Sequence, residues 1–284
     1  MAYTRAYEEY EVAPELRKIY SQIKANFDIP FVPTLFKVLA HCPAYLDVIW
    51  RDLGHGAASK EFHAATFGFE EFIRSEAIRG GWQFSEQERV LATQGIARAD
   101  MPVIGGLVGV FVRALPRLAL FSRLMQRGYS GGQRGRVSDA KHSPALSRMV
   151  TVHVPSERDA SLRVWLIYSD IKRTTGAKNV MSMFRMLAPY PTYLGSVWVD
   201  ARKVLANREF QRSRDQLIQR SIGLLNGLPV RDHRHLARDI SERDWRDIEE
   251  TVDGFAKLLP QFALLSAVWL RSFAVYRSKY AAAS

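Results

Sequence analysis

Residues 232–235, Asp-His-Arg-His, have a composition that could bind a metal ion. Asp232, His233 and His235 are all residue types that bind metals, but the two histidines are two positions apart. On a helix this spacing points them in different directions, whereas histidine ligand pairs on a helix stand four apart. The segment follows Pro229, so the favoured interpretation is an exposed loop, and no metal is expected.

Other chemistry-bearing motifs are also lacking. The glycines of RGGWQ (79–83) and YSGGQRGR (129–136) match neither GxGxxG nor a phosphate-binding loop. Ser182 has no GxSxG setting, so a serine nucleophile is unsupported. The single cysteine, Cys42, excludes an internal disulfide. No cofactor is expected.

Composition predicts a globular and cytoplasmic protein. The chain has 284 residues, 47% of them hydrophobic, and a net charge of +11. Its basic residues are scattered among acids, so nucleic acid is not expected as a partner. The N-terminus has no apolar signal segment. The most apolar stretch, 102–121, is broken by Arg113, Pro116 and Arg117, which predicts a buried or amphipathic helix and no membrane span.

One phrase of the sequence occurs twice. IYSQIK (19–24) returns as IYSDIK (167–172), an offset of 148 residues, and the match extends without gaps from residue 19 to residue 62. Over these 44 positions 17 residues are identical, where unrelated sequence of ordinary composition would give roughly three. The chain therefore contains a duplication.

The duplicated parts have the apolar spacing of helices. In the first helix of each half, apolar residues recur every three or four positions. They are Leu16, Ile19, Ile23 and Phe27 in the first half, and Val164, Ile167 and Ile171 in the second. A second helix should carry Val32, Phe36 and Leu39. Proline suits the first turn of a helix, so Pro43 and Pro191 predict the start of a third helix in each half.

These patterns predict an all-α fold of two tandem homologous repeats packed as a pseudo-twofold unit. The first repeat should span 1–126 and the second 161–284, with a linker at 127–160 rich in Gly, Ser and Arg. A pseudo-twofold axis would leave a cleft between the repeats. The sequence is also compatible with a homodimer.

Two segments resemble a known family, the non-stereospecific (group I) 2-haloacid dehalogenases. These segments are IPFVPTLFKVLAHCPAYLDVIW (29–50) and MSMFRMLAPYPTYLGSVW (181–198), and NGLP (226–229) also fits. The resemblance implies an all-α duplicated fold and a hydrolase that acts on the carbon–halogen bond at C2 of a short carboxylic acid. It also implies direct attack by water, activated by an aspartate of the second repeat with help from an asparagine of the first.

The resemblance implies which residues bind substrate. An aromatic and a neighbouring residue of the first repeat, Phe31 and Thr34 here, would line the pocket. In the second repeat the family's aspartate stands between a serine and a phenylalanine. Those two are Ser182 and Phe184 here, and Met183 stands between them. Methionine cannot accept a proton from water, so the family's base is missing.

Another carboxylate would have to replace this base. The family's asparagine maps near ARADMPVIGG (97–106), onto Met101 or Asp100. Asp100 is a hypothetical catalytic base, and an exposed aspartate at a helix end is the alternative interpretation.

Three functions remain open at this point. The chain is a 2-haloacid dehalogenase-like hydrolase with an altered base, or a family member that binds a small carboxylate or other apolar ligand in the inter-repeat cleft without this chemistry. The third is a basic protein that binds an anionic membrane or nucleic acid through residues 126–136.

Overall fold

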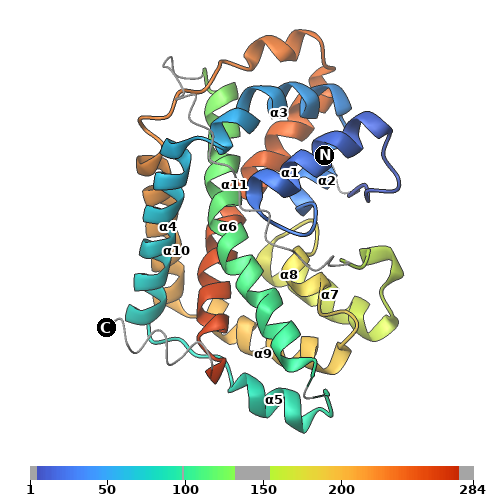
Figure 1. Ribbon diagram of the computed structural model, residues 1–284, viewed down its shortest axis with the longest axis vertical. Helices are drawn as coiled ribbons and strands as arrows, with labels where there is room; N and C mark the ends of the chain where they lie inside the picture. The colour runs from blue at the N-terminus through green and yellow to red at the C-terminus, as the bar shows by residue number, and fades with distance from the viewer. Residues whose placement is uncertain (1–4, 98, 132–153, 275–284) are drawn as a thin grey trace. The chain divides into compact units, whose positions relative to one another are not determined.

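The computed structural model describes residues 5–97, 99–131 and 154–274, and every regular element in these ranges is a helix (Figure 1). The all-α prediction is confirmed for this part of the chain. The first half contains α1 (Pro14–Phe27), α2 (Thr34–Leu39), α3 (Pro43–Ala57), α4 (Lys60–Arg79), α5 (Gln87–Thr93) and α6 (Met101–Tyr129). The second half contains η1 (Glu157–Asp159), α7 (Leu162–Thr175), α8 (Ser182–Arg185), α9 (Pro191–Leu205), α10 (Arg208–Leu224), η2 (Arg234–Arg238) and α11 (Glu242–Leu270).

The helix boundaries follow the 148-residue offset of the sequence. Both ends of α1 and α7 differ by this number, as do both ends of α3 and α9. The starts of α2 and α8, and of α4 and α10, also differ by 148. The predicted helix starts at Pro43 and Pro191 are confirmed, and α1 likewise begins at a proline, Pro14. These boundaries are what a duplicated helical sequence should give.

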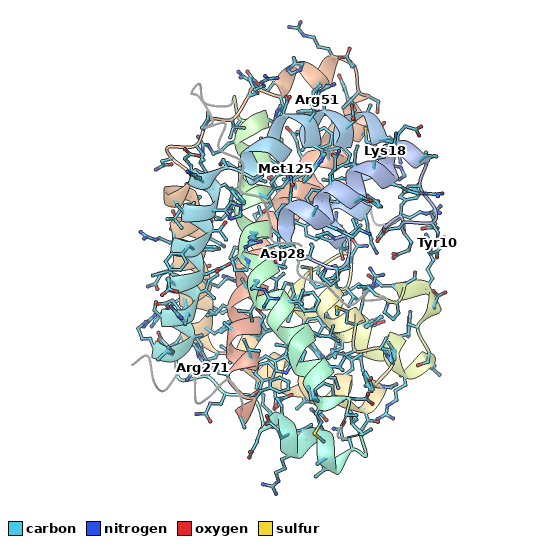
Figure 2. The ribbon with its side chains drawn as sticks, viewed as in Figure 1. Tyr10, Lys18, Asp28, Arg51, Met125 and Arg271 are labelled. Atoms are coloured by element: carbon cyan, nitrogen blue, oxygen red, sulfur yellow. The ribbon has the colours of Figure 1, made fainter. Side chains whose placement is uncertain are left out.

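The first helix of each half ends in the same backbone conformation. Asp28 lies at the C-terminal end of α1 (Figure 2). It has φ 52° at this C-cap, and Gly176, which lies 148 residues later at the C-cap of α7, has φ 71°. Both angles are left-handed, a common way to end a helix that glycine adopts without strain. Asp28 keeps the turn although its side chain makes this conformation costly.

The structure divides into two compact units that interleave along the chain. The first unit contains α1, α2 and α3, and takes further residues from Pro116 onward in α6 and from Gln219–Leu259. The second contains α5 and α7 to α9, residues Glu70–Leu115, and α11 from Pro260. The helices α6 and α11 pass from one unit to the other at a proline inside the helix, Pro116 or Pro260. The predicted boundaries of the repeats, 1–126 and 161–284, concern ancestry and stay a prediction, and linker residues 132–153 lie outside the described residues.

The first unit has an aromatic core built on α2. The Phe36 ring is fully buried, and its centroid lies 5.8 Å from that of Phe27, 5.9 Å from Trp50 and 5.5 Å from Phe121. The Trp50 indole N–H donates to Gln22 Oε1 at 2.7 Å. The buried indole therefore keeps a hydrogen-bond partner, as such groups usually require.

The second unit repeats this arrangement on α8. The Phe184 ring lies 5.6 Å from that of Trp198 at 86°, the same angle as between Phe36 and Trp50. The Trp198 indole N–H donates to Asp170 Oδ2 at 2.8 Å, and Asp170 lies 148 residues after Gln22. Trp50 and Trp198, which the 148-residue offset pairs, are therefore both core residues that hydrogen-bond within their own units.

The apolar stretch 102–121 lies within α6. By length and composition α6 could cross a membrane, and it is the single such helix among the described residues. Within its most apolar window 61% of the residues are buried, which is typical of the core helices of globular proteins.

Candidate functional site

Both segments that carry the sequence resemblance contain a very short helix. α2 has six residues and follows Pro33, and α8 has four residues and follows Met181. Each preceding residue is extended, with ψ near 145° (146° and 143°). Helices this short are not stable alone. Packing of the surrounding chain must hold them, and every residue of both is buried.

Phe31 and Thr34 lie at the start of α2 in the first unit. Each is 3% exposed, Phe31 in the extended stretch before the helix and Thr34 as its first residue. The predicted second helix therefore begins later than expected, because Val32 precedes Pro33 and a residue before proline is biased toward extended backbone. The role of Phe31 and Thr34 in binding substrate stays a prediction.

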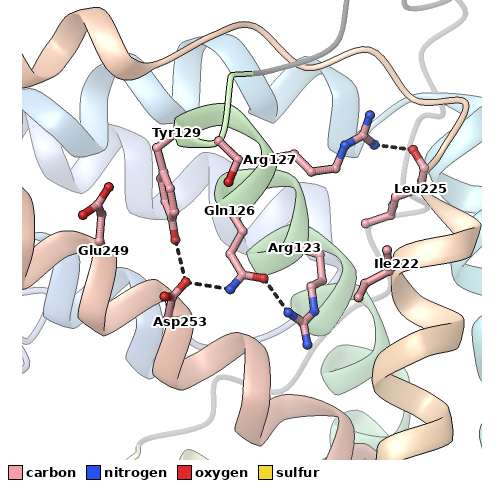
Figure 3. A pocket seen from close by; sticks show the side chains of 9 residues that line it. Arg123, Gln126, Arg127, Tyr129, Ile222, Leu225, Glu249 and Asp253 are labelled. Carbon is pink, nitrogen blue, oxygen red and sulfur yellow. Dashed lines mark hydrogen bonds between the residues drawn. The ribbon is translucent and has the colours of Figure 1, made fainter.

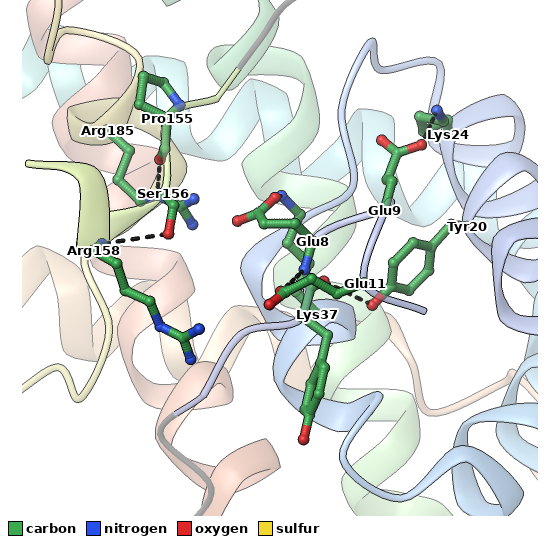
Figure 4. Close-up of polar contacts among 11 residues, drawn as sticks. Glu8, Glu9, Glu11, Tyr20, Lys24, Lys37, Pro155, Ser156, Arg158 and Arg185 are labelled. Carbon is green, nitrogen blue, oxygen red and sulfur yellow. Dashed lines mark hydrogen bonds and ion pairs between the residues drawn. The ribbon is translucent and has the colours of Figure 1, made fainter. Parts of the chain in front are cut away.

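Polar residues of the N-terminal segment contact α1 and α2 in the first unit (Figure 4). The buried Lys37 of α2 forms an ion pair with Glu8, and Tyr7 N–H donates to the Lys37 carbonyl at 2.9 Å. The Lys24 ammonium pairs with Glu9 at 2.7 Å. Burial together with nearby glutamates raises the pKa of Tyr20 well above its ordinary value. Tyr20 is therefore a neutral hydrogen-bond donor, and it donates to the Tyr7 carbonyl at 3.1 Å.

Ser182 and Met183 begin α8 in the second unit. Ser182 is 7% exposed and Met183 is 1% exposed. Two further buried methionines, Met181 and Met186, flank them. Methionine is unbranched and polarisable, so a cluster of these side chains can adapt to small apolar groups.

The charged residues around α8 belong to the second unit. Arg185 is 1% exposed, and its Nε donates to the Pro155 carbonyl at 2.7 Å (Figure 4). Glu157 accepts from Val180 N–H at 2.6 Å and pairs with the Lys172 ammonium at 3.1 Å. This pair lies 148 residues after the pair of Glu9 and Lys24.

The charges near α8 affect the pKa of Tyr168. Burial raises the pKa of Tyr168 to about 12, with Arg185 opposing the rise and Glu157 adding to it. The segment around α8 thus contains buried methionines, a buried cation, and a carboxylate that is already hydrogen-bonded. Such an arrangement could hold a small anion with an apolar substituent, but position 183 contributes no group that could deprotonate water.

Asp100 lies at the N-terminal end of α6. Its carbonyl accepts from Ile104 N–H at 3.0 Å, the first hydrogen bond of that helix, so Asp100 occupies the N-cap position. It is half-buried. Within the described residues its carboxylate has no hydrogen bond or ion pair with α8. Aspartate is favoured at a helix N-cap, and the role of Asp100 as a catalytic base stays a prediction.

The Asp-His-Arg-His segment differs from its prediction. The His233 side chain is fully buried, with Nε2 3.4 Å from Asp52 Oδ2, and its backbone N–H donates to the Gly128 carbonyl at 2.8 Å. The expectation of an exposed loop is therefore wrong for His233, although Asp232 and His235 are exposed. Among the described residues no group of three His, Cys, Asp or Glu could hold a metal ion.

The first unit also has a pocket that sequence reasoning missed. It has a volume of about 510 Å³ and is formed by the C-terminal end of α6, the end of α10 and one face of α11 (Figure 3). Its lining residues are Arg123, Gln126, Arg127, Tyr129, Ser130, Ile222, Leu225, Glu249 and Asp253. One signal was available in the sequence, the pair Arg123 and Arg127, because residues four apart share one face of a helix.

Comparison with known proteins identifies relatives of this chain. Two relatives named (R)-2-haloacid dehalogenase are similar in sequence. The one from Pseudomonas putida is 24% identical over 236 residues, which cover 81% of this chain and 78% of the relative. The one from Rhizobium sp. (strain NHG3) is 22% identical over 229 residues, 79% of this chain and 88% of the relative.

Solved structures show the same fold. A D-2-haloacid dehalogenase mutant in complex with D-2-CPA superposes with a TM-score of 0.85, at 20% identity, over 94% of this chain and 95% of that one. A crystal structure of a D-2-haloacid dehalogenase mutant gives a TM-score of 0.84, at 20% identity, over 93% and 94%. The sequence model of the family described as "Halocarboxylic acid dehydrogenase DehI" matches residues 30–184 and 180–284, which include both α2 and α8. This chain therefore belongs to the halocarboxylic acid dehydrogenase DehI family.

Proposed function

We propose that this protein is a 2-haloacid dehalogenase-like hydrolase that removes the halogen from C2 of short 2-halocarboxylic acids by direct attack of water. The observation that carries the proposal is the family match, which extends over both short helices α2 and α8. The chain covers more than three quarters of each relative named (R)-2-haloacid dehalogenase. Assignment to the non-stereospecific group I is part of the proposal and rests on the resemblance of segments 29–50 and 181–198.

The base in this proposal is not residue 183. A thioether sulfur is too weak a base to take a proton from water, and the Met183 side chain is buried. Another carboxylate must then act, and we propose Asp100, which lies at the N-cap of α6 in the same unit as α8. The other binding residues in this proposal are Phe31 and Thr34 from the first repeat and Ser182 and Met183 from the second.

A second candidate function is favoured by Met183 itself. The replacement of a carboxylate by methionine makes the region around α8 more apolar and removes the group that the family mechanism needs. A protein of this kind would bind a small carboxylate or other apolar ligand without hydrolysing it. We further propose a cytoplasmic location and no nucleic-acid partner, on composition alone.

The test is halide release from D- and L-2-chloropropionate by the unmodified protein and by the Asp100→Asn variant. Loss of a general base typically lowers a rate by about 10²–10⁴-fold, so Asp100→Asn should reduce halide release by at least the lower figure. The matched control is Asp47→Asn, because Asp47 is an aspartate on α3 with a side chain 61% exposed. Equal rates for Asp100→Asn and Asp47→Asn would remove Asp100 from the mechanism.

The second candidate has its own readout. If the unmodified protein releases no halide but 2-chloropropionate raises its thermal unfolding midpoint, and raises it equally in Arg123→Met, the ligand binds the folded state without turnover and outside the pocket of the first unit. That result would favour the ligand-binding function over the hydrolase.

A further inference from the structure

The pocket of the first unit presents different chemistry on its two sides (Figure 3). Glu249 and Asp253 project from α11 on one side, and Ile222 and Leu225 lie on the opposite side, at the end of α10. The polar residues of α6 lie between these walls. A ligand in the pocket therefore meets carboxylates on one side and aliphatic groups on the other.

The carboxylate side is already hydrogen-bonded. Asp253 Oδ1 accepts from Gln126 Nε2 at 2.6 Å and from the Tyr129 hydroxyl at 3.2 Å. Glu249 Oε1 accepts from the Trp245 indole N–H at 3.0 Å. Burial first, and the charge of Asp253 next, raise the pKa of Tyr129 above its ordinary value, so its hydroxyl remains a donor. These donors hold the acids of α11 in place.

Arg123 is incompletely paired. Its Nη1 donates to Gln126 Oε1 at 2.6 Å, so the amide of Gln126 stands between this guanidinium and Asp253. The Nε and Nη2 atoms of Arg123 are buried and have no hydrogen-bond partner among the described residues. A buried donor without a partner is costly, and more so on a charged group. Nε and Nη2 form an edge of the guanidinium that can bind both oxygens of one carboxylate.

Arg127 adds a second cation on the same face of α6. It lies four residues after Arg123, and its Nη1 donates to the Leu225 carbonyl beside the aliphatic wall. Burial lowers the pKa of both guanidinium groups relative to their ordinary value. Both remain charged at neutral pH because arginine starts from so high a value.

We propose that this pocket binds a short-chain carboxylate, with the carboxylate on Arg123 and Arg127 and the alkyl group against Ile222 and Leu225. The site is formed within the first unit and uses none of the residues Phe31, Thr34, Ser182, Met183 or Asp100. It is therefore independent of the proposed hydrolysis. The occupant is defined by its chemistry: one carboxylate and a few carbon atoms.

The experiment uses propionate as the probe and Ile222 as a local reporter. The full chain is labelled with ¹³C at the isoleucine δ1 methyl groups, the Ile222 signal is identified with Ile222→Val, and propionate is titrated at constant ionic strength with sodium chloride as reference. The Ile222 signal should move with propionate in the unmodified protein and in Arg51→Met, a control at an arginine whose side chain is 65% exposed. In Arg123→Met the apparent affinity should fall by about tenfold or more.

Thermal unfolding of Arg123→Met, measured in parallel, tests whether misfolding causes the loss of propionate affinity. Arg123→Met removes a buried charge of which two donors lack partners among the described residues, so its unfolding midpoint should equal or exceed that of the unmodified protein. The proposal is overturned if the Ile222 signal ignores propionate, responds equally to chloride, or responds unchanged in Arg123→Met. Halide release is a separate readout, so failure of the hydrolase would leave this result interpretable.

Discussion

The aromatic cores of the two units predict that Phe36 and Phe184 contribute similar stability, although they lie 148 residues apart. Both rings are fully buried. Replacing a buried phenylalanine by alanine typically costs about 3–5 kcal/mol, and each aromatic pair adds roughly 0.5–1.5 kcal/mol beyond burial. Phe36 contacts three aromatic rings and Phe184 contacts two. We therefore expect each replacement to lower the free energy of unfolding by about 4 kcal/mol. The loss for Phe36→Ala should exceed that for Phe184→Ala by up to about 1 kcal/mol, because Phe36 has one more aromatic neighbour.

The assay is urea unfolding followed by circular dichroism, with Phe67→Ala as control. Phe67 lies on α4 and is 65% exposed, so its replacement should change the free energy of unfolding by less than about 0.5 kcal/mol. Alanine favours helix at all three positions, which removes a difference in helix propensity as a cause. A loss for Phe36→Ala or Phe184→Ala within about 1 kcal/mol of the control would refute the assignment of these rings to the cores.

Two further predictions concern pH. Burial, the largest cause, lowers the pKa of His233 in the folded state below the ordinary 6.5. The unfolded chain therefore binds the proton first, and stability present above about pH 6.5 should decrease as pH falls below it. His233→Gln should flatten this dependence in thermal unfolding between pH 7 and pH 5, and an equally steep profile would contradict it. Hydrogen bonds from Trp198 and then Arg173 lower the pKa of Asp170 below 3.8. Its stabilising contribution should be present above that value and lost at lower pH, so Asp170→Asn should destabilise at pH 7 and lose this effect in strong acid, as unfolding midpoints would show.

The helices were predictable because their signals are local. Apolar residues three and four apart define the buried face of α1, and prolines such as Pro43 and Pro191 mark helix starts. The start of α11 was also predictable, since Ser241 precedes acids and its hydroxyl accepts from Asp244 N–H at 3.1 Å. Ser85 is also followed by an acid, Glu86, and the same pattern would place a helix start there, but the structure differs. α5 begins at Gln87, and Ser85 N–H instead donates to Asp200 at 2.8 Å, a partner 115 residues away.

The parts that sequence reasoning missed depend on contacts between distant segments. His233 was expected in an exposed loop, yet it is buried against Asp52, 181 residues earlier in the chain. Nothing in the local sequence indicates that partner. Likewise the pocket of the first unit needs the ends of α6 and α10 and one face of α11 together. The absence of an acid at position 183, in contrast, is visible in the sequence once the resemblance is recognised, and the structure adds that Met183 is buried.

The most direct test of the central claim is halide release from D- and L-2-chloropropionate by the unmodified protein, compared with Met183→Leu and Met183→Asp. If the chain is a dehalogenase whose base lies elsewhere, the unmodified protein releases halide and Met183→Leu does so at a similar rate, because residue 183 supplies only apolar surface. Met183→Asp should then alter the rate of halide release, because it adds a carboxylate to a site whose base already lies elsewhere. No halide from the unmodified protein, with release by Met183→Asp alone, would contradict the account and show a binding site that has lost its base.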